Sequence, residues 1–271
     1  MTIASNSKLI VAGGGGVNDL DNCILTNNGT VVWVSGTMRG GQTTVYNNGL
    51  WDAQSDQTVN DVLSGSPFLF DNIGTFRKSG TAGGSSQLQN GVTFNNAGTL
   101  DVQTGIVSLL GTYNLTSGTL DFTLNSLTNF GQLNLVSSVA LGGPLNVNLA
   151  GGFVPSNGDQ FHVVSSSGLS GTFSSVSMPA GISVTYSNNG VFLFVLGTVP
   201  VQIINTKLMG TNLLFQFPTI SDQSYTVQQS TNLATTNWVF YTNIIGNGSV
   251  YQFQTPVMAI PAQSFFRVRE P

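Results

Sequence analysis

Charged residues are scarce in this chain of 271 residues. They make up 7% of it, and the formal net charge is −4, whereas soluble domains usually carry about 25% charged residues. Exposed helix faces are normally built from charged residues, but exposed strand faces can be built from Thr, Ser, Asn and Gln. With 33 Gly, 27 Asn and a hydrophobic share of 40%, the composition predicts a folded, all-β protein rather than a disordered one.

Further shortages each argue against a class of function. Seven scattered Lys and Arg residues are too few for a nucleic-acid interface, and no run of about 18 apolar residues predicts a transmembrane segment. The single cysteine, Cys23, rules out an internal disulfide framework, and we expect it to be buried. The single histidine, His162, gives little basis for a Ser-His-Asp triad or a metal site.

The N-terminal segment 1–16 lacks the charged region and the apolar region of an intact signal peptide. We therefore expect either that a signal has been removed or that the chain is a fragment. An uncharged surface rich in Asn, Ser and Thr is typical of an extracellular or cell-surface protein, so the composition favours that location.

A recurring motif of Asn-Asn, Gly and an apolar residue divides the first half of the chain. The steps between its glycines are 20, 25, 24, 20 and 13 residues, at Gly29, Gly49, Gly74, Gly98, Gly118 and Gly131. Periods of this size are typical of solenoids. We expect coils of a parallel β-solenoid, with Gly providing bends of positive φ and Asn side chains hydrogen-bonded along a row between coils.

Apolar and polar residues alternate within each repeat. Leu100 and Val102 alternate with Thr99 and Asp101, which is the period-2 pattern of half-buried strands. Trp33 and Trp51 fall on the inward parity, so we expect both in the core. The alternative is an exposed aromatic platform for sugar rings.

The strict repeat fades after about residue 140. Residues 140–197 are predicted to form antiparallel strands that close the solenoid, because an open solenoid end is an exposed sheet edge. The segment Ser187–Gly190 fits a hairpin turn. The solenoid with its cap is thus assigned to residues 1–197.

A second domain is predicted for residues 198–271. The segment Gly197–Pro200 fits a linker, and the short strands that follow have the spacing of a small β-sandwich. We expect Trp238 in the core of this sandwich.

Two segments resemble known types of secreted bacterial protein. The run from Asn95 to Gly197, with NNAGTLDV, Gly142–Val147 and Gly171-Thr172-Phe173, resembles the passenger repeats of autotransporter-type surface proteins. The strands around Tyr225, Trp238 and Phe266 are similar to a C-terminal β-sandwich of planctomycete and verrucomicrobial secreted proteins. These resemblances imply a surface location and, for the sandwich, a sorting, anchoring or accessory role. They imply no catalytic residues.

One set of positions could carry chemistry. Three residues past each repeat glycine stand Val32, Asp52, Arg77, Asp101, Asp121 and Asn134. If the coils are in register, these residues form one outward row, with Asp101 and Asp121 about 4.8 Å apart. That separation is close to the roughly 5 Å between the carboxyl groups of retaining glycosidases, and one of the two would have a raised pKa.

Several interpretations of this row stay open. The row could be a solvated polar face with weak ion pairs, or it could bind a glycan through Asp52, Arg77, Asp101 and Asp121. In the second case Arg77 would contact an acidic sugar or hold one aspartate ionised. The carboxylates could also hold a Ca²⁺ ion, although the sequence predicts no dedicated metal site and no other cofactor. Asp52, Asp56 and Asp61 fit a loop.

The sequence favours a non-enzymatic extracellular or cell-surface structural or adhesive protein, with polysaccharide, surface proteins or further copies of itself as partners. The alternative is a polysaccharide-active enzyme, a hydrolase or a lyase, with Asp101 and Asp121 as its catalytic residues. A third alternative is a carbohydrate-binding module, which would expose Trp or Tyr.

Overall fold

The computed structural model describes residues 1–63, 65, 67–196, 201–220, 223–234 and 237–269. The predicted linker Gly197–Pro200, where the proposed domain boundary falls, lies outside these residues. The chain divides into two compact units. The first comprises Met1–Asn148, Asp159–Pro179 and Ser183–Phe194, and the second comprises Leu149–Gly158, Ala180–Ile182 and Val195–Pro271. The described residues form strands and one short 3-10 helix, Val257–Ala259, as the all-β prediction requires.

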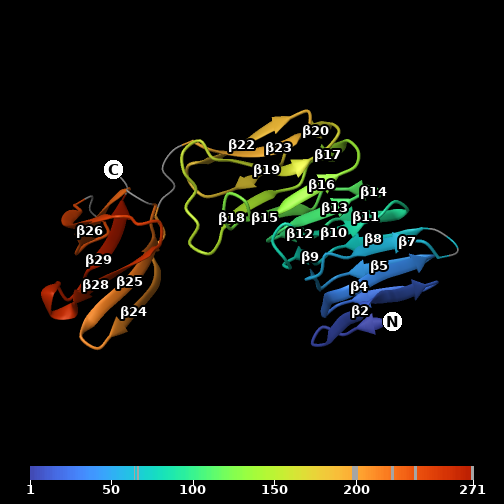
Figure 1. Ribbon diagram of the computed structural model, residues 1–271, viewed down its shortest axis with the longest axis horizontal. Coiled ribbons are helices and arrows are strands. Elements are labelled where there is room, and N and C mark those ends of the chain that lie inside the picture. The colour runs from blue at the N-terminus through green and yellow to red at the C-terminus, as the bar shows by residue number, and fades with distance from the viewer. Residues whose placement is uncertain (64, 66, 197–200, 221–222, 235–236, 270–271) are drawn as a thin grey trace. The chain divides into compact units, whose positions relative to one another are not determined.

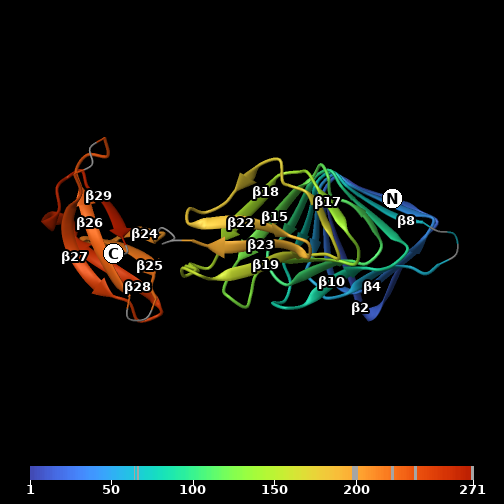
Figure 2. The ribbon, with the colours of Figure 1, turned by 90° about the horizontal axis from the view of Figure 1, so that it is seen from above.

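The first unit is a parallel β-solenoid of about six turns, in which each full coil contributes a strand to three columns. Figures 1 and 2 show the strands of successive coils running side by side. The first column is β1 (Thr2–Ile3), β3 (Ile24–Asn27), β5 (Thr43–Asn47), β8 (Phe68–Asn72), β11 (Val92–Asn96) and β14 (Thr112–Asn114).

The other two columns belong to one continuous sheet. Two long strands, β2 (Lys8–Asp21) and β4 (Thr30–Gly41), contribute to both columns. The second column continues with β6 (Leu50–Ala53), β9 (Thr75–Lys78), β12 (Thr99–Val102), β15 (Thr119–Leu124), β18 (Leu145–Leu149) and β21 (Val176–Ser177). The third continues with β7 (Thr58–Asp61), β10 (Ser85–Leu88), β13 (Ile106–Leu109), β16 (Gln132–Leu135) and β19 (Gln160–Ser165).

The repeat glycines are required by close approach of the backbone. A Cβ atom on Gly49 would lie 2.1 Å from the carbonyl oxygen of Gly29, and one on Gly74 would lie 2.2 Å from that of Gly49. Neither glycine has a positive φ, so the prediction of left-handed bends at these positions was wrong. Any side chain here would collide with the coil before it.

Gly131 does not belong to this ladder. A Cβ on Gly131 would meet the carbonyl oxygen of Val102, whereas a Cβ on Gly143 would lie 2.0 Å from that of Gly118. The true step after Gly118 is therefore 25 residues (143 − 118), similar to the earlier steps.

The solenoid interior is filled by aromatic and aliphatic side chains. Trp33 and Trp51 are 0% and 1% exposed, which confirms that both are core residues and argues against a sugar platform. Rings from different columns meet edge to face, such as Trp51 with Phe70 at a centroid distance of 5.0 Å. Cys23 is a free thiol and only half-buried, contrary to the prediction that it is buried.

Parallel pairing continues past residue 140, where antiparallel strands were predicted to begin. β17 (Val139–Leu141) pairs in parallel with β20 (Leu169–Gly171), and β18 pairs in parallel with β21. Among the described strands of the first unit, antiparallel pairing is seen between β19 and β23 (Gly190–Val195), and β22 (Ile182–Ser187) lies beside β23 at the end of the sheet. The last two strands flank the predicted hairpin turn and protect the edge of the third column.

The second unit consists of two three-stranded antiparallel sheets. One has the order β24 (Ile204–Met209), β25 (Asn212–Pro218), β28 (Val250–Pro256), and the other has the order β27 (Val239–Ile245), β26 (Ser224–Ser230), β29 (Phe265–Arg269). The core between them includes Phe215, Phe217 and Tyr225. Trp238 is half-buried outside this core, with the guanidinium of Arg267 4.4 Å from its ring centroid, so its prediction as a core residue was wrong.

Candidate functional site: a polar row on the solenoid

The predicted outward row exists in the second column. Asp52 pairs with Val32 and with Arg77, Arg77 pairs with Asp101, and Asp101 pairs with Asp121. Because neighbouring strands lie about 4.8 Å apart, these side chains follow one another along the column. Asp52, which was also expected to line a loop, therefore lies on a strand.

Asn134 is not a member of the row. It lies on β16 and pairs with Ser108 of β13, in the third column. The sequence prediction placed it in the row because Gly131 was counted as a repeat glycine. Three residues past the true glycine, Gly143, stands Asn146, whose side chain forms a hydrogen bond with Asp121.

The first part of the row is held by its own neighbours. Asp52 is 8% exposed and accepts hydrogen bonds from Gln54 Nε2, at 2.7 Å, and from Ser79 Oγ. Arg77 Nε donates to Asp101 Oδ2 at 2.8 Å. Of the two expected roles of Arg77, the ion pair with an aspartate is thus the one observed.

The two paired carboxylates have different surroundings. Asp101 accepts a second hydrogen bond, from Gln103 Nε2 at 3.0 Å, and its side chain is 12% exposed. Asp121 accepts one from Asn148 Nδ2 at 2.7 Å. Burial, followed by the negative charge of Asp101, raises the pKa of Asp121, although hydrogen bonds from Asn146 and Asn148 and the charge of Arg77 counteract the effect. The expectation that one of the pair has a raised pKa is confirmed.

A buried lysine beside the row was missed by the sequence analysis. Lys78 follows Arg77 on β9 and is 0% exposed, between Ala53 and Val102 in the neighbouring coils. Its ammonium forms an ion pair of 2.9 Å with Asp56, whose side chain is 38% exposed. The signal was present, because Lys78 has the same strand parity as the core residue Phe76.

Asp56 lies in the bend between β6 and β7. Thr81 Oγ1 also donates a hydrogen bond to its carboxylate. Burial alone would raise the pKa of Asp56, but the bonds from Thr81 and Lys78 outweigh it and the net shift is downward. This ion pair joins two coils at a corner of the solenoid.

The remaining candidate groups do not assemble into a reactive site. The His162 ring stacks on Phe192 at a centroid distance of 4.1 Å, and its Nε2 lies 3.3 Å from the carbonyl oxygen of Asn189. In the described part of the chain, no group of three or more His, Cys, Asp or Glu side chains gathers as metal ligands would. Among the same residues, no helix has the length and apolarity that crossing a bilayer requires.

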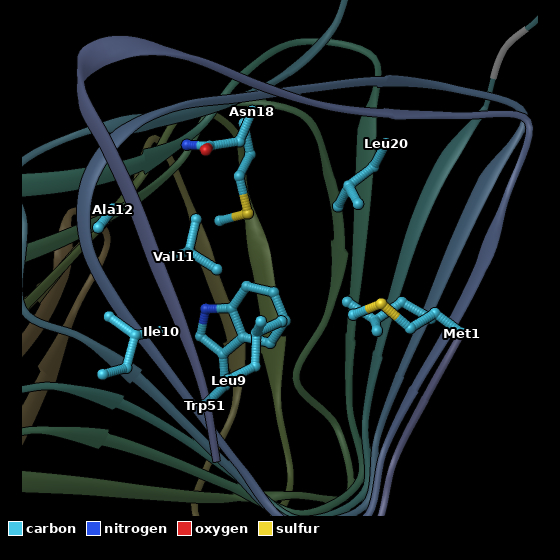
Figure 3. Close-up of a pocket in the computed structure, with 10 residues that line it drawn as sticks. Met1, Leu9, Ile10, Val11, Ala12, Asn18, Leu20 and Trp51 are labelled. Carbon is cyan, nitrogen blue, oxygen red and sulfur yellow. The ribbon is translucent and has the colours of Figure 1, made fainter.

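A cavity of about 380 Å³ lies among the first coils. It is lined mainly by apolar side chains, including Met1, Leu9, Leu20 and Trp51. Figure 3 shows Leu9, Trp51, Met1 and Leu20 among the side chains that line this cavity. The indole N–H of Trp51 has no hydrogen-bond partner among the described residues.

A cavity of about 450 Å³ lies in the second unit, where it is lined by residues such as Gln229, Asn232 and Val239. Neither of these two cavities includes a residue of the polar row. Comparison of the sequence with protein-family models gives no match, and comparison with curated proteins gives none either.

Proposed function

We propose that this chain is a non-enzymatic extracellular or cell-surface protein with a structural or adhesive role. The second-column face of the solenoid would be its contact surface. The observation that carries this proposal is that the carboxylates of the row are already engaged by neighbouring side chains: Asp52 by Gln54 and Ser79, and Asp101 by Arg77 and Gln103. Groups fixed in this way suit a rigid contact surface better than proton transfer.

Polysaccharide is the partner that this face favours. The row is flanked by a column of hydroxyl groups on Thr75, Thr99 and Thr119, which are aligned strand by strand. These half-buried threonine hydroxyl groups, spaced about 4.8 Å apart, can form repeated hydrogen bonds with a sugar chain. A bacterial surface protein of the autotransporter-passenger type, with an accessory C-terminal module, is the setting that we propose.

The second candidate is a glycoside hydrolase that uses Asp101 and Asp121. It is favoured by the raised pKa of Asp121 and by the adjacency of the two carboxyl groups in paired strands, which resembles the roughly 5 Å spacing of retaining enzymes. The ion pair between Arg77 and Asp101 argues against it, because it engages one of the two carboxylates.

A glycan array combined with a reducing-sugar release assay separates the two candidates. Wild type and Asp101→Asn/Asp121→Asn are compared, with Asp71→Asn as the matched control. Asp71 lies on β8 in the first column, where it accepts a hydrogen bond from Asn95. Binding without sugar release supports the adhesive role. Release that disappears only in the double variant would make the chain a hydrolase, and absence of both binding and release would contradict the polysaccharide partner.

A further inference from the structure

The second unit carries its described charges on two of its four sheet edges. In residues 201–220, 223–234 and 237–269 the charged side chains are Lys207 on β24, and Arg267 and Arg269 on β29. Both are edge strands, as are β27 and β28. Positive charges on an edge hinder pairing with another copy of the same strand, because like charges would come together. The edges β27 and β28 carry no charge.

Of the two uncharged edges, only β28 is regular. The pairing of β27 with β26 has a register shift between Val227 and Gln228, and such an irregularity makes an edge a poor template. By contrast, β28 pairs with β25 over its whole length without a shift. Among the described residues β28 has no other strand partner, so its outer side is an open sheet edge, with β25 between it and β24 (Figure 1).

The two faces of β28 are clearly different. Phe253 lies in the core and is 5% exposed. The ring centroid of Tyr251 lies 5.6 Å from the ring centroid of the core residue Phe217. Gln252 and Gln254 alternate with these residues and are exposed on the other face. Any strand that pairs with β28 must therefore present a similar alternation of polar and apolar residues.

We infer that β28 of one molecule pairs antiparallel with β28 of a second copy, about a twofold axis at Phe253. In this register Gln252 faces Gln254 of the second copy, Tyr251 faces Thr255, and the two Phe253 side chains are neighbours. Each residue meets one on the same face of the sheet, so the strand is complementary to itself. The result is a continuous sheet of six strands with twofold symmetry, and the pairing is independent of what the solenoid contacts.

Introducing positive charge at the two glutamines tests this pairing. The variant Gln252→Lys/Gln254→Lys would place like charges opposite each other twice in the dimer, while both substitutions stay on the exposed face. Sedimentation velocity over a concentration series should show wild type at twice the monomer mass of 28.4 kDa and should show dimerisation of the variant weakened about tenfold or more. An equimolar mixture with Gln252→Glu/Gln254→Glu should restore the dimer.

The matched control is Thr206→Lys/Leu208→Lys, which adds the same charges with the same spacing to the exposed side of edge strand β24. It should dimerise like wild type. Wild type that stays monomeric at every concentration would overturn the inference, and binding of an unrelated extended peptide to such a monomer would assign the edge to a different partner. A dimer that persists equally in the lysine variant would place the contact elsewhere and also overturn it.

Discussion

The side-chain Nδ2 of Asn47 donates a hydrogen bond of 2.7 Å to Oδ1 of Asn72, one coil further along the solenoid. The same bond joins Asn27 to Asn47 and Asn72 to Asn96, each at 2.7 Å. All four side chains are at most 2% exposed. Asparagine has both donors and an acceptor in one side chain, so each residue can satisfy its neighbours on both sides, and the row forms a buried ladder.

Replacing Asn72 by alanine should interrupt this ladder. Asn47 Nδ2 would lose an acceptor, and both Asn96 Oδ1 and the carbonyl oxygen of Thr99 would lose a donor. Buried polar groups without partners are costly, so we expect a loss of about 2–3 kcal/mol of stability, measured by urea unfolding. The control is Asn48→Ala, which removes only an exposed bond to Asn28, and an equal loss in both variants would contradict the role of the buried ladder.

Gly74→Ala should be among the most damaging single substitutions in the solenoid. The new Cβ would lie 2.2 Å from the carbonyl oxygen of Gly49 in the neighbouring coil. Neither the backbone at Gly74 nor the backbone at Gly49 can move away without breaking the strand register. We expect a loss of about 3 kcal/mol or more, seen as a fall in Tm or in soluble yield. At Gly168 the nearest atom to a new Cβ is Ser138 Cβ, at 3.2 Å, so Gly168→Ala should be mild, and similar damage there would argue against backbone collision.

The ion pair between Lys78 and Asp56 should respond unequally to removal of its two partners. Asp56→Ala leaves a fully buried ammonium without its anionic partner, and we expect it to cost about 2 kcal/mol, below the usual range for buried pairs because Asp56 is partly exposed. Lys78→Met removes the buried charge and leaves a carboxylate that water can reach, so it should cost less. Chemical unfolding of both variants measures the difference, and the reverse order would contradict this assignment.

The same pair should contribute to acid sensitivity. The folded-state pKa of Asp56 lies below its ordinary value of 3.8, so its contribution to stability is present above that value and is lost as the pH falls through the folded pKa. Between neutral pH and strongly acidic pH, Lys78→Met should therefore lose less stability than wild type. Identical pH profiles of unfolding would show that the pair contributes nothing.

Asp121→Asn should have the opposite pH dependence. The folded-state pKa of Asp121 is raised, so ionisation of this group lowers stability as the pH rises from the unfolded pKa through the folded pKa. The variant should therefore be more stable than wild type at neutral pH, and this advantage should disappear in acid, where Asp121 is protonated. Thermal unfolding over a pH series measures this, and an advantage that persists at low pH would point to a cause other than charge.

Most of the candidate site followed from spacing in the sequence. The three-residue offset from the repeat glycines placed Asp52, Arg77, Asp101 and Asp121 in one row because paired coils keep a fixed register. The last member was misplaced because Gly131, which lies directly before β16 of the third column, looks like a repeat glycine in the sequence. Only backbone contact distinguishes Gly143 from Gly131.

Period-2 alternation and regular glycine spacing determined the β-solenoid, the inward direction of Trp33 and Trp51 and the order of the polar row, because these depend on local strand geometry and on the length of a coil. The tertiary structure decided which partner each side chain meets. It brought the Lys78 ammonium to Asp56, kept the solenoid parallel as far as β21 and left β28 as a regular uncharged edge. These features depend on contacts between residues far apart in the chain, and local pattern carries no information about such contacts.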